Sequence, residues 1–173
     1  MQHIEGNFMG KQQITSKDTS ISVVNKIYTN KDFSRGSNIL DYGGGKYDKN
    51  IEYMAKKGCK VVIYDPYNRS NEYNKQTITF VNSQPIHYIV CSNVLNVIKE
   101  DSVVEEVISN IAKIKSRNPG CTVYISVYEG DKTGISKETS KGWQRNLKTK
   151  EYYPLICKYL AIYETKNGII VCK

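Results

Sequence analysis

Apolar residues recur along the chain at two spacings, which predicts an alternation of helices and strands. Residues 20–28 carry apolar side chains three or four positions apart, as in a helix with one buried face. The segment 38–42 (NILDY) and the segment 59–65 (CKVVIYD) read as short strands, the second one covered on both faces. Between them, residues 51–55 place apolar side chains on one face of a second helix, which Gly58 would end.

The alternation continues in the second half of the chain. We expect a third strand at residues 76–81 (QTITFV), a fourth at 87–92 (HYIVCS) and a fifth at 121–129 (CTVYISVYE). The helix between the fourth and fifth strands is the clearest amphipathic helix of the chain. Ser102 and Glu105 form a capping-box pattern at its start.

The C-terminal part predicts one more helix and a hairpin. Pro154 restricts the helix to a start near Tyr153, because proline is tolerated only in the first turn. Asn167-Gly168 separates two closing strands and is a strong hairpin signal. The order of elements therefore predicts an α/β fold: a doubly wound, mostly parallel, seven-stranded sheet with a C-terminal antiparallel hairpin. We expect residues 1–173 to form a single domain.

The composition fits a protein of the cytoplasm. The chain has 173 residues, of which 39% are hydrophobic and 24% are charged. It has no apolar run near the roughly 20 residues that cross a bilayer, and its start does not resemble a signal peptide. Five cysteines are scattered without metal-site spacing, as expected of free thiols in a reducing compartment. We therefore expect a cytoplasmic location, no membrane partner and no metal.

The net charge of +8 has two explanations. Lysine and arginine bind phosphates, so the charge favours a nucleic acid or another phosphate-bearing partner. The lysines are also spread along the whole chain, which is equally expected of a general compositional bias.

The most informative chemistry lies where the first strand ends. Gly43, Gly44 and Gly45 follow that strand directly, and three glycines allow a sharp turn or a close approach of the backbone to a ligand. Asp41 precedes the turn and Asp65 ends the next strand. An acid at Asp41 would repel a pyrophosphate but attract a cationic sulfonium or amino group, which favours S-adenosylmethionine (SAM) over NAD. Both aspartates can also be ordinary carboxylates at strand ends.

These residues resemble a known family. LDYGGGKYDK (40–49) is similar to motif I of class I SAM-dependent methyltransferases, and VVIYDPY (61–67) is similar to their motif II. CSNVLNVI (91–98) resembles the segment after their fourth strand. The resemblance covers about residues 38–130 and implies a Rossmann-like methyltransferase sheet, SAM as cofactor and methyl transfer as activity. The stretch 127–154 also resembles small methyltransferase-like proteins of bacteria and their phages.

The resemblance implies how the cofactor is bound. Asp41 would orient its amino acid part, and Gly43, Gly44 and Gly45 would let the chain pass close to it. Asp65 would hold the ribose hydroxyls, and two neighbours would stack near the adenine: Pro66 and Tyr67.

It also implies residues beside the adenine edge and the reacting methyl group. Asn82 or Ser83 would lie near the adenine edge, and Ser92 and Asn93 would face the transferable methyl group.

The sequence departs from the family pattern at two places. Tyr47 replaces the last glycine of motif I. The segment after the fourth strand also lacks the Asn/Asp-Pro-Pro-aromatic signature and a Pro-Cys nucleophile, which argues against the common DNA adenine-N6, cytosine-N4 and cytosine-C5 methylases.

Two polar segments are candidates for covering the site. Residues 1–20 would be an N-terminal arm or lid, and residues 130–150 a basic loop over the active edge. Trp143, the only tryptophan, could stack on a planar group while Arg145 and the lysines of the loop meet phosphate. The loop can equally be a solvated excursion. A base for the acceptor would come from the end of the fifth strand: Tyr128, Glu129 or Asp131.

Three functions remain open from the sequence. The first is a SAM-dependent methyltransferase with Asn93, Tyr128 and Arg145 at the reacting groups and an acceptor that is a nucleic acid or another phosphate-bearing molecule. The second is a SAM-binding protein without catalysis. The third is a basic nucleic-acid-binding module on the same scaffold.

Overall fold

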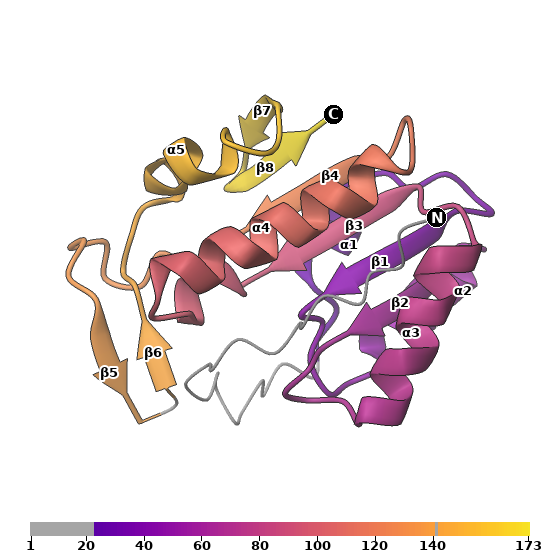
Figure 1. Cartoon of the computed structure of the whole chain (residues 1–173), viewed down its shortest axis with the longest axis horizontal. Helices are drawn as coiled ribbons and strands as arrows, with labels where there is room; N and C mark the ends of the chain where they lie inside the picture. The colour runs from indigo at the N-terminus through magenta and orange to yellow at the C-terminus, as the bar shows by residue number, and fades with distance from the viewer. Residues whose placement is uncertain (1–22, 141) are drawn as a thin grey trace.

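A six-stranded sheet forms the centre of the structure (Figure 1). The structure is a computed structural model and describes residues 23–140 and 142–173, so the expected arm at 1–20 lies outside the described residues. The strand order is β2-β1-β3-β4-β8-β7. In chain order these strands are β1 (Asn38–Tyr42), β2 (Lys60–Tyr64), β3 (Tyr88–Ser92), β4 (Thr122–Ser126), β7 (Ile162–Lys166) and β8 (Ile169–Cys172).

The direction of the strands confirms the expected mostly parallel sheet. β1 pairs in parallel with both β2 and β3, and Leu40 lies opposite Val62 on one side and Ile89 on the other. β3 pairs in parallel with β4, whereas β8 is antiparallel to both β4 and β7. The turn between β7 and β8 contains Asn167 and Gly168 with φ of 54° and 70°. Both values are the positive φ that a tight hairpin turn requires.

Helices cover the two faces of the sheet. They are α1 (Lys26–Asn30), α2 (Lys49–Lys56), α3 (Asn71–Ser83), α4 (Asp101–Ser116) and α5 (Tyr153–Ile156), with 3-10 turns η1 (Leu95–Val97) and η2 (Thr149–Tyr152). Ile39 and Leu40 are adjacent on β1 and belong to different cores, because successive side chains of a strand point to opposite faces. Met54 of α2 packs in the core of Ile39, and Ile111 of α4 packs in the core of Leu40.

The expected third strand at 76–81 is wrong, because these residues belong to α3. Ser70 caps this helix, and its hydroxyl accepts a hydrogen bond from the Tyr73 amide at 3.2 Å. Asn74, Thr77 and Val81 form its buried stripe at helical spacing. The β-branched residues predicted a strand, but the cap and this stripe decide for a helix. The sheet therefore has six strands in the described residues, not seven.

Two further local expectations need correction. α4 begins at Asp101 after Glu100, so Ser102 is not its cap, and Glu105 instead accepts hydrogen bonds from Lys158 and Tyr159. The expected loop at 130–150 contains a short hairpin of β5 (Lys137–Thr139) and β6 (Gly142–Gln144).

The expectation of free cysteines is confirmed. All five are unpaired, and four of them are buried. Burial raises the pKa of the Cys121 thiol to about 12. None of the helices in the described part of the chain combines the length and the apolar character needed to span a bilayer.

The core contacts of α4 generate a stability prediction. Ile111 is fully buried, so Ile111→Ala should lower the free energy of unfolding by about 2–5 kcal/mol through lost burial and the cavity left behind. Urea unfolding monitored by circular dichroism measures this difference. Lys113→Ala, on the exposed face of the same helix, is the control and should change it by less than about 0.5 kcal/mol. Equal effects of the two substitutions would contradict the described packing.

Candidate functional site

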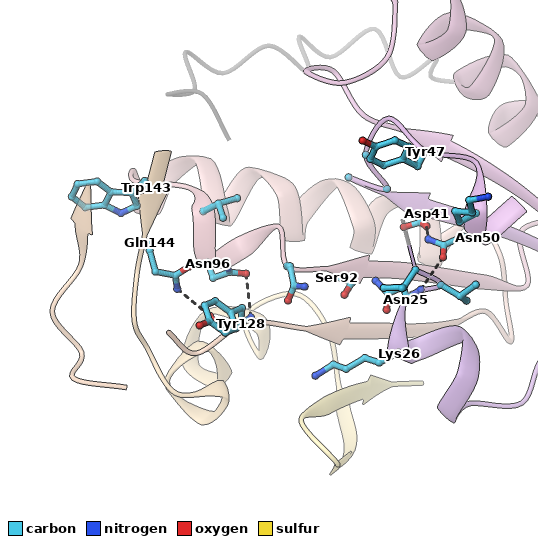
Figure 2. Close-up of a pocket in the computed structure, with 18 of the residues that line it drawn as sticks. Asn25, Lys26, Asp41, Tyr47, Asn50, Ser92, Asn96, Tyr128, Trp143 and Gln144 are labelled. Atoms are coloured by element: carbon cyan, nitrogen blue, oxygen red, sulfur yellow. Dashed lines mark hydrogen bonds between the residues drawn. The ribbon is translucent and has the colours of Figure 1, made fainter. Parts of the chain in front are cut away.

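A cavity of about 640 Å³ opens at the carboxyl ends of β1, β3 and β4 (Figure 2). Asp41 and Tyr47, which flank the glycine turn of residues 43–45 in the chain, lie at one end, and Trp143 of the β5–β6 hairpin lies at the other. Ligands of open α/β sheets bind at this edge, where neighbouring connections leave on opposite faces. The cavity is therefore the candidate site.

The glycine turn is held by close packing. Gly43 donates its amide to the carbonyl of Tyr64 at 2.7 Å and has a φ of 78°. A Cβ atom at Gly43 would collide with the side chain of Val94, and one at Gly44 would lie 2.7 Å from Cγ of Asp41. The first two glycines are thus required by their protein neighbours. All three glycines of the turn line the cavity wall.

Asp41 places a buried carboxylate in the cavity wall. It is 1% exposed and accepts a hydrogen bond from Nδ2 of Asn50 at 2.9 Å. Burial raises the pKa of Asp41 to about 6, although the Asn50 hydrogen bond opposes the shift. Within residues 23–140 and 142–173, no lysine or arginine forms an ion pair with this carboxylate. A cationic group of a ligand can therefore pair with this carboxylate from within the cavity.

Asp65 is close to the glycine turn but does not line the cavity. It is 4% exposed, and its carboxylate accepts hydrogen bonds from the backbone amides of Gly45 at 2.8 Å, Tyr67 at 3.0 Å and Asn68 at 2.9 Å. Pro66 does not line the cavity either. The structure thus brings Asp41 and the glycines together and leaves these two residues behind the wall.

Ser92 and Asn93, which the resemblance assigns to the transferable methyl group, line the cavity at the end of β3. The Ser92 hydroxyl lies 2.8 Å from the hydroxyl of Ser126 on the neighbouring strand. Asn93 has a φ of 58°, and its amide donates to the carbonyl of Ser126 at 2.8 Å. Asparagine tolerates this left-handed conformation better than most residues, and the resulting bend directs the chain along the cavity.

Asn96 lines the cavity although the sequence analysis assigns it no part in the site. It is buried and donates through Nδ2 to Oε1 of Gln144 at 3.2 Å. Its Oδ1 accepts the Tyr128 amide at 3.4 Å, and Gln144 donates to the Tyr128 carbonyl at 3.0 Å (Figure 2). This ring of hydrogen bonds joins the ends of β3 and β4 to β6. Its only sequence signal is a second asparagine three residues after Asn93.

Of the three candidate bases at the end of β4, Tyr128 alone lines the cavity. Glu129 accepts hydrogen bonds from the amide and hydroxyl of Thr149, both at 2.7 Å, and these bonds lower its pKa to about 2. Lys137 and Thr133 likewise lower the pKa of Asp131 to about 2. Carboxylates with such low pKa values are weak bases, so these two residues are not suited to deprotonating an acceptor.

Arg145 does not face the cavity, which corrects its expected place at the reacting groups. Its guanidinium is buried and donates to the carbonyls of Ile98 and Lys99 and to the carboxylate of Asp101, at 2.5, 3.0 and 2.6 Å. These bonds occupy the side chain and attach the β6 end of the hairpin to the start of α4. Arg145 is therefore not available to bind phosphate.

Trp143 lies in the cavity wall beside this attachment. The Nζ atom of Lys99 lies 4.9 Å from the centre of the Trp143 ring, and the Nε1 atom of Trp143 is buried without a hydrogen-bond partner.

Asn82 lies away from the site, which corrects its expected place at the adenine edge. Residues 71–83 form a helix, and near its end the Asn82 side chain accepts a hydrogen bond from Arg117. It does not line the cavity.

The raised pKa of Asp41 predicts a pH-dependent stability. Asp41 is protonated in both the folded and the unfolded protein below about pH 4, and it is ionised in both above about pH 6. Between these values the unfolded protein loses the Asp41 proton more readily than the folded one. The free energy of unfolding therefore falls as the pH rises through this interval. Asp41→Asn should therefore gain stability relative to wild type over this interval, by on the order of 3 kcal/mol. Urea unfolding at pH 4, 5, 6 and 7.5 measures the difference. Asp32→Asn, at an exposed position, is the control, and a pH-independent difference for Asp41→Asn would refute the assignment.

The attachment of the hairpin predicts a fluorescence change. Arg145→Met removes three donated hydrogen bonds, so it should lower the free energy of unfolding by about 1.5–3 kcal/mol and release the hairpin. Because Trp143 is the only tryptophan, its emission should shift to longer wavelength and be quenched more strongly by acrylamide. Arg117→Met, which removes an exposed hydrogen bond to Asn82, is the control. An unchanged emission in Arg145→Met would contradict the attachment.

Comparison with known proteins gives a family and a fold. A family model described as a methyltransferase domain matches residues 21–159, whereas no curated protein matches the chain. A SAM-dependent methyltransferase from Clostridium acetobutylicum has a similar solved structure, with 10% identity and a TM-score of 0.50 over 79% of this chain and 82% of that one.

Two other solved structures are also similar. Coclaurine N-methyltransferase, bound to N-methylheliamine and S-adenosylhomocysteine, has 10% identity and a TM-score of 0.52 over 92% of this chain and 56% of that one. A Rhodobacter sphaeroides protein described among the zinc-dependent alcohol dehydrogenases has 9% identity and a TM-score of 0.54 over 91% and 92%.

At such low identities these likenesses show the fold alone, which is the expected mostly parallel α/β sheet with antiparallel C-terminal strands. The family model adds what the fold cannot, because it matches most of the chain, including the glycine turn and the segment after β3. The chain belongs to the methyltransferase domain family, which agrees with the resemblance found in the sequence.

Proposed function

We propose that this protein is a SAM-dependent methyltransferase that binds its cofactor at the glycine turn and its acceptor beside the β5–β6 hairpin. The observation that carries the proposal is one continuous cavity that reaches from Asp41 and the glycines to Trp143. Its volume of about 640 Å³ lies within the range of small-molecule sites. A cofactor and an acceptor have to share one such space for a methyl group to pass between them.

The residues at the glycine end fit the amino acid part of SAM. Asp41 offers a buried carboxylate without an ion-pair partner, and the ammonium group of SAM would supply the missing positive charge. Asn50 keeps this carboxylate oriented through its hydrogen bond. Bound SAM brings a methyl group on a sulfonium, which is already activated for displacement.

The protein then has to align the acceptor and exclude water. Positioning of this kind can supply about 7–11 kcal/mol of the barrier. Ser92 lies between the two ends of the cavity (Figure 2), Asn93 follows it in the cavity lining, and we assign both to the reacting methyl group and acceptor. Asn96 and Gln144 hold the acceptor end in place through their hydrogen bonds to Tyr128.

The titratable groups of the cavity favour an acceptor that needs no strong base. Among the described residues, Asp41 is the only acid that lines the cavity, and it lies at the cofactor end. Tyr128 is the remaining candidate at the acceptor end. We therefore propose a nitrogen acceptor with a free lone pair or an oxygen that is already ionised.

Two positive residues support a phosphate-bearing acceptor. Lys26 and Lys49 line the cavity, and Lys26 extends into the space below Ser92 (Figure 2). Lys49 is next to Asn50 at the glycine end and also pairs with Glu52 at 3.4 Å, so Lys26 is the residue that carries this proposal. A nucleic acid is one such acceptor, and a small phosphorylated molecule is another.

A SAM-binding protein without catalysis is the second candidate. The observation that favours it is Tyr47, which lines the cavity at the position of the last motif I glycine and narrows the space there. Binding with no transfer to any acceptor would be its signature.

Calorimetric titration with SAM, S-adenosylhomocysteine and NAD tests the proposal. We expect SAM and S-adenosylhomocysteine to bind and NAD not to bind. SAM should bind more weakly at pH 5 than at pH 7.5, because protonation of Asp41, with its pKa of about 6, removes the charge that attracts the ammonium. Asp41→Asn should bind weakly at both pH values.

Other outcomes separate the alternatives. Binding of NAD, or of none of the three ligands, would overturn the cofactor assignment. When SAM binds, release of S-adenosylhomocysteine is followed with oligonucleotides, nucleotides and small amines as acceptors. Turnover with any of them supports the methyltransferase, and tight binding without turnover supports the second candidate.

A further inference from the structure

Both backbone polar groups of Gly45 are held by one loop after β2. The Gly45 amide donates to Oδ2 of Asp65 at 2.8 Å. The Gly45 carbonyl accepts from Nε of Arg69 at 2.7 Å. Gly45 has a φ of 76° and lines the cavity, so its peptide groups shape the cavity wall. We call Asp65 and Arg69 the Gly45 clamp.

Two further contacts hold the Arg69 side chain in this position. Its side chain is 10% exposed, and one of its terminal nitrogens pairs with Oδ1 of Asp48 at 2.8 Å. The guanidinium also lies 4.8 Å from the ring centre of Tyr73 on α3. Asp48 directly precedes α2, so Arg69 ties the glycine turn to the start of α2 and to α3.

Asp65 is equally fixed from its own side. Asn74 of α3 accepts the Asp65 amide at 2.9 Å and donates to the Asp65 carbonyl at 3.0 Å. The side-chain amide of Asn68 donates to both carboxylate oxygens at 3.1 Å. With these donors and the three backbone amides, both oxygens of Asp65 are engaged by protein groups.

We propose that Asp65 and Arg69 are positioning residues for the cofactor site. They fix the Gly45 turn from behind the cavity wall, and Asp65 does not hold the ribose hydroxyls. The inference rests on the proposed function for its ligand, and it assigns Asp65 a role other than the one implied by the resemblance. It also assigns a role to Arg69, for which the sequence pattern gives no signal.

The two roles of Asp65 differ in how they tolerate an amide. A carboxylate only accepts hydrogen bonds, whereas an asparagine side chain presents an NH₂ group on one side. In Asp65→Asn that NH₂ would face either the Gly45 amide or the amides of Tyr67 and Asn68, and none of these can accept. A residue that only binds ribose would lose part of its bond to the ribose hydroxyls on this change, because a neutral amide is a weaker acceptor than a carboxylate, but it would leave the Gly45 amide undisturbed. If Asp65 holds the Gly45 turn, Asp65→Asn should therefore break at least one of its hydrogen bonds to the backbone amides of Gly45, Tyr67 and Asn68.

The first arm of the test measures the clamp without any ligand. Amide hydrogen exchange by NMR reports on the Gly45 amide in the free protein. We expect this amide to be protected in wild type and to exchange at least tenfold faster in Asp65→Asn. A Gly45 amide that is unprotected in wild type, or equally protected in Asp65→Asn, would overturn the clamp.

The second arm measures ligand affinity by calorimetry with S-adenosylhomocysteine and its 2′-deoxy analogue. The proteins are wild type, Asp65→Asn, Arg69→Met and the control Arg117→Met, each with its thermal unfolding recorded. Arg69→Met keeps an apolar stem against Tyr73 and loses the donors, so it carries the test if Asp65→Asn does not fold. Both clamp variants should bind S-adenosylhomocysteine about tenfold or more weakly than wild type, and the control should bind it with unchanged affinity.

The analogue distinguishes positioning from ribose binding. If the clamp acts through Gly45, loss of the 2′-hydroxyl weakens binding by the same factor, within about twofold, in all four proteins. If that factor disappears in Asp65→Asn but persists in Arg69→Met, Asp65 binds the ribose and the proposal is wrong. If wild type binds no S-adenosylhomocysteine, the proposed function fails, while the exchange arm still decides whether the clamp exists.

Discussion

Burying a carboxylate without a counterion costs free energy, and the site is arranged around one such group. Asp41 lies near the carboxyl end of β1, which has a parallel neighbour on each side. Its hydrogen bond from Asn50 fixes the first turn of α2, and Asn50 in turn accepts the amide of Asn25 at 3.0 Å, just before α1. The strand end and the starts of two helices are thus joined by one chain of hydrogen bonds that begins at the Asp41 carboxylate.

The opposite end of the cavity follows a different principle. There the chain uses neutral amides, and the ring of Asn96, Gln144 and Tyr128 satisfies buried polar groups without a net charge. Arg145 adds charge behind this ring, where its donors meet two carbonyls and Asp101. The glycine end of the cavity thus carries a buried carboxylate, whereas the hairpin end satisfies its buried polar groups with paired neutral amides.

The sequence predicted the parts of the site that depend on local chain order. The glycine turn, Asp41 and the ends of β3 and β4 follow from strands that end at one edge, and Asn167-Gly168 determines its hairpin by its own φ preferences. The misplaced residues depend on distant partners. Arg145 pairs with Asp101, which lies 44 positions earlier in the chain, and no local sequence pattern predicts this pair. Residues 76–81 have strand-forming side chains, but Ser70 and the burial of Thr77 against β2 make them helical, which also moves Asn82 away.

The position of β8 has a consequence for how the protein is made. β8 lies between β4 and β7 and is buried along its whole length, although it contains residues 169–172 (Figure 1). Its partner β4 comes more than 40 residues earlier, so this pairing closes a long loop of chain. During synthesis, one edge of β4 therefore stays unpaired until residues 169–172 have left the ribosome, and only then can this pairing form.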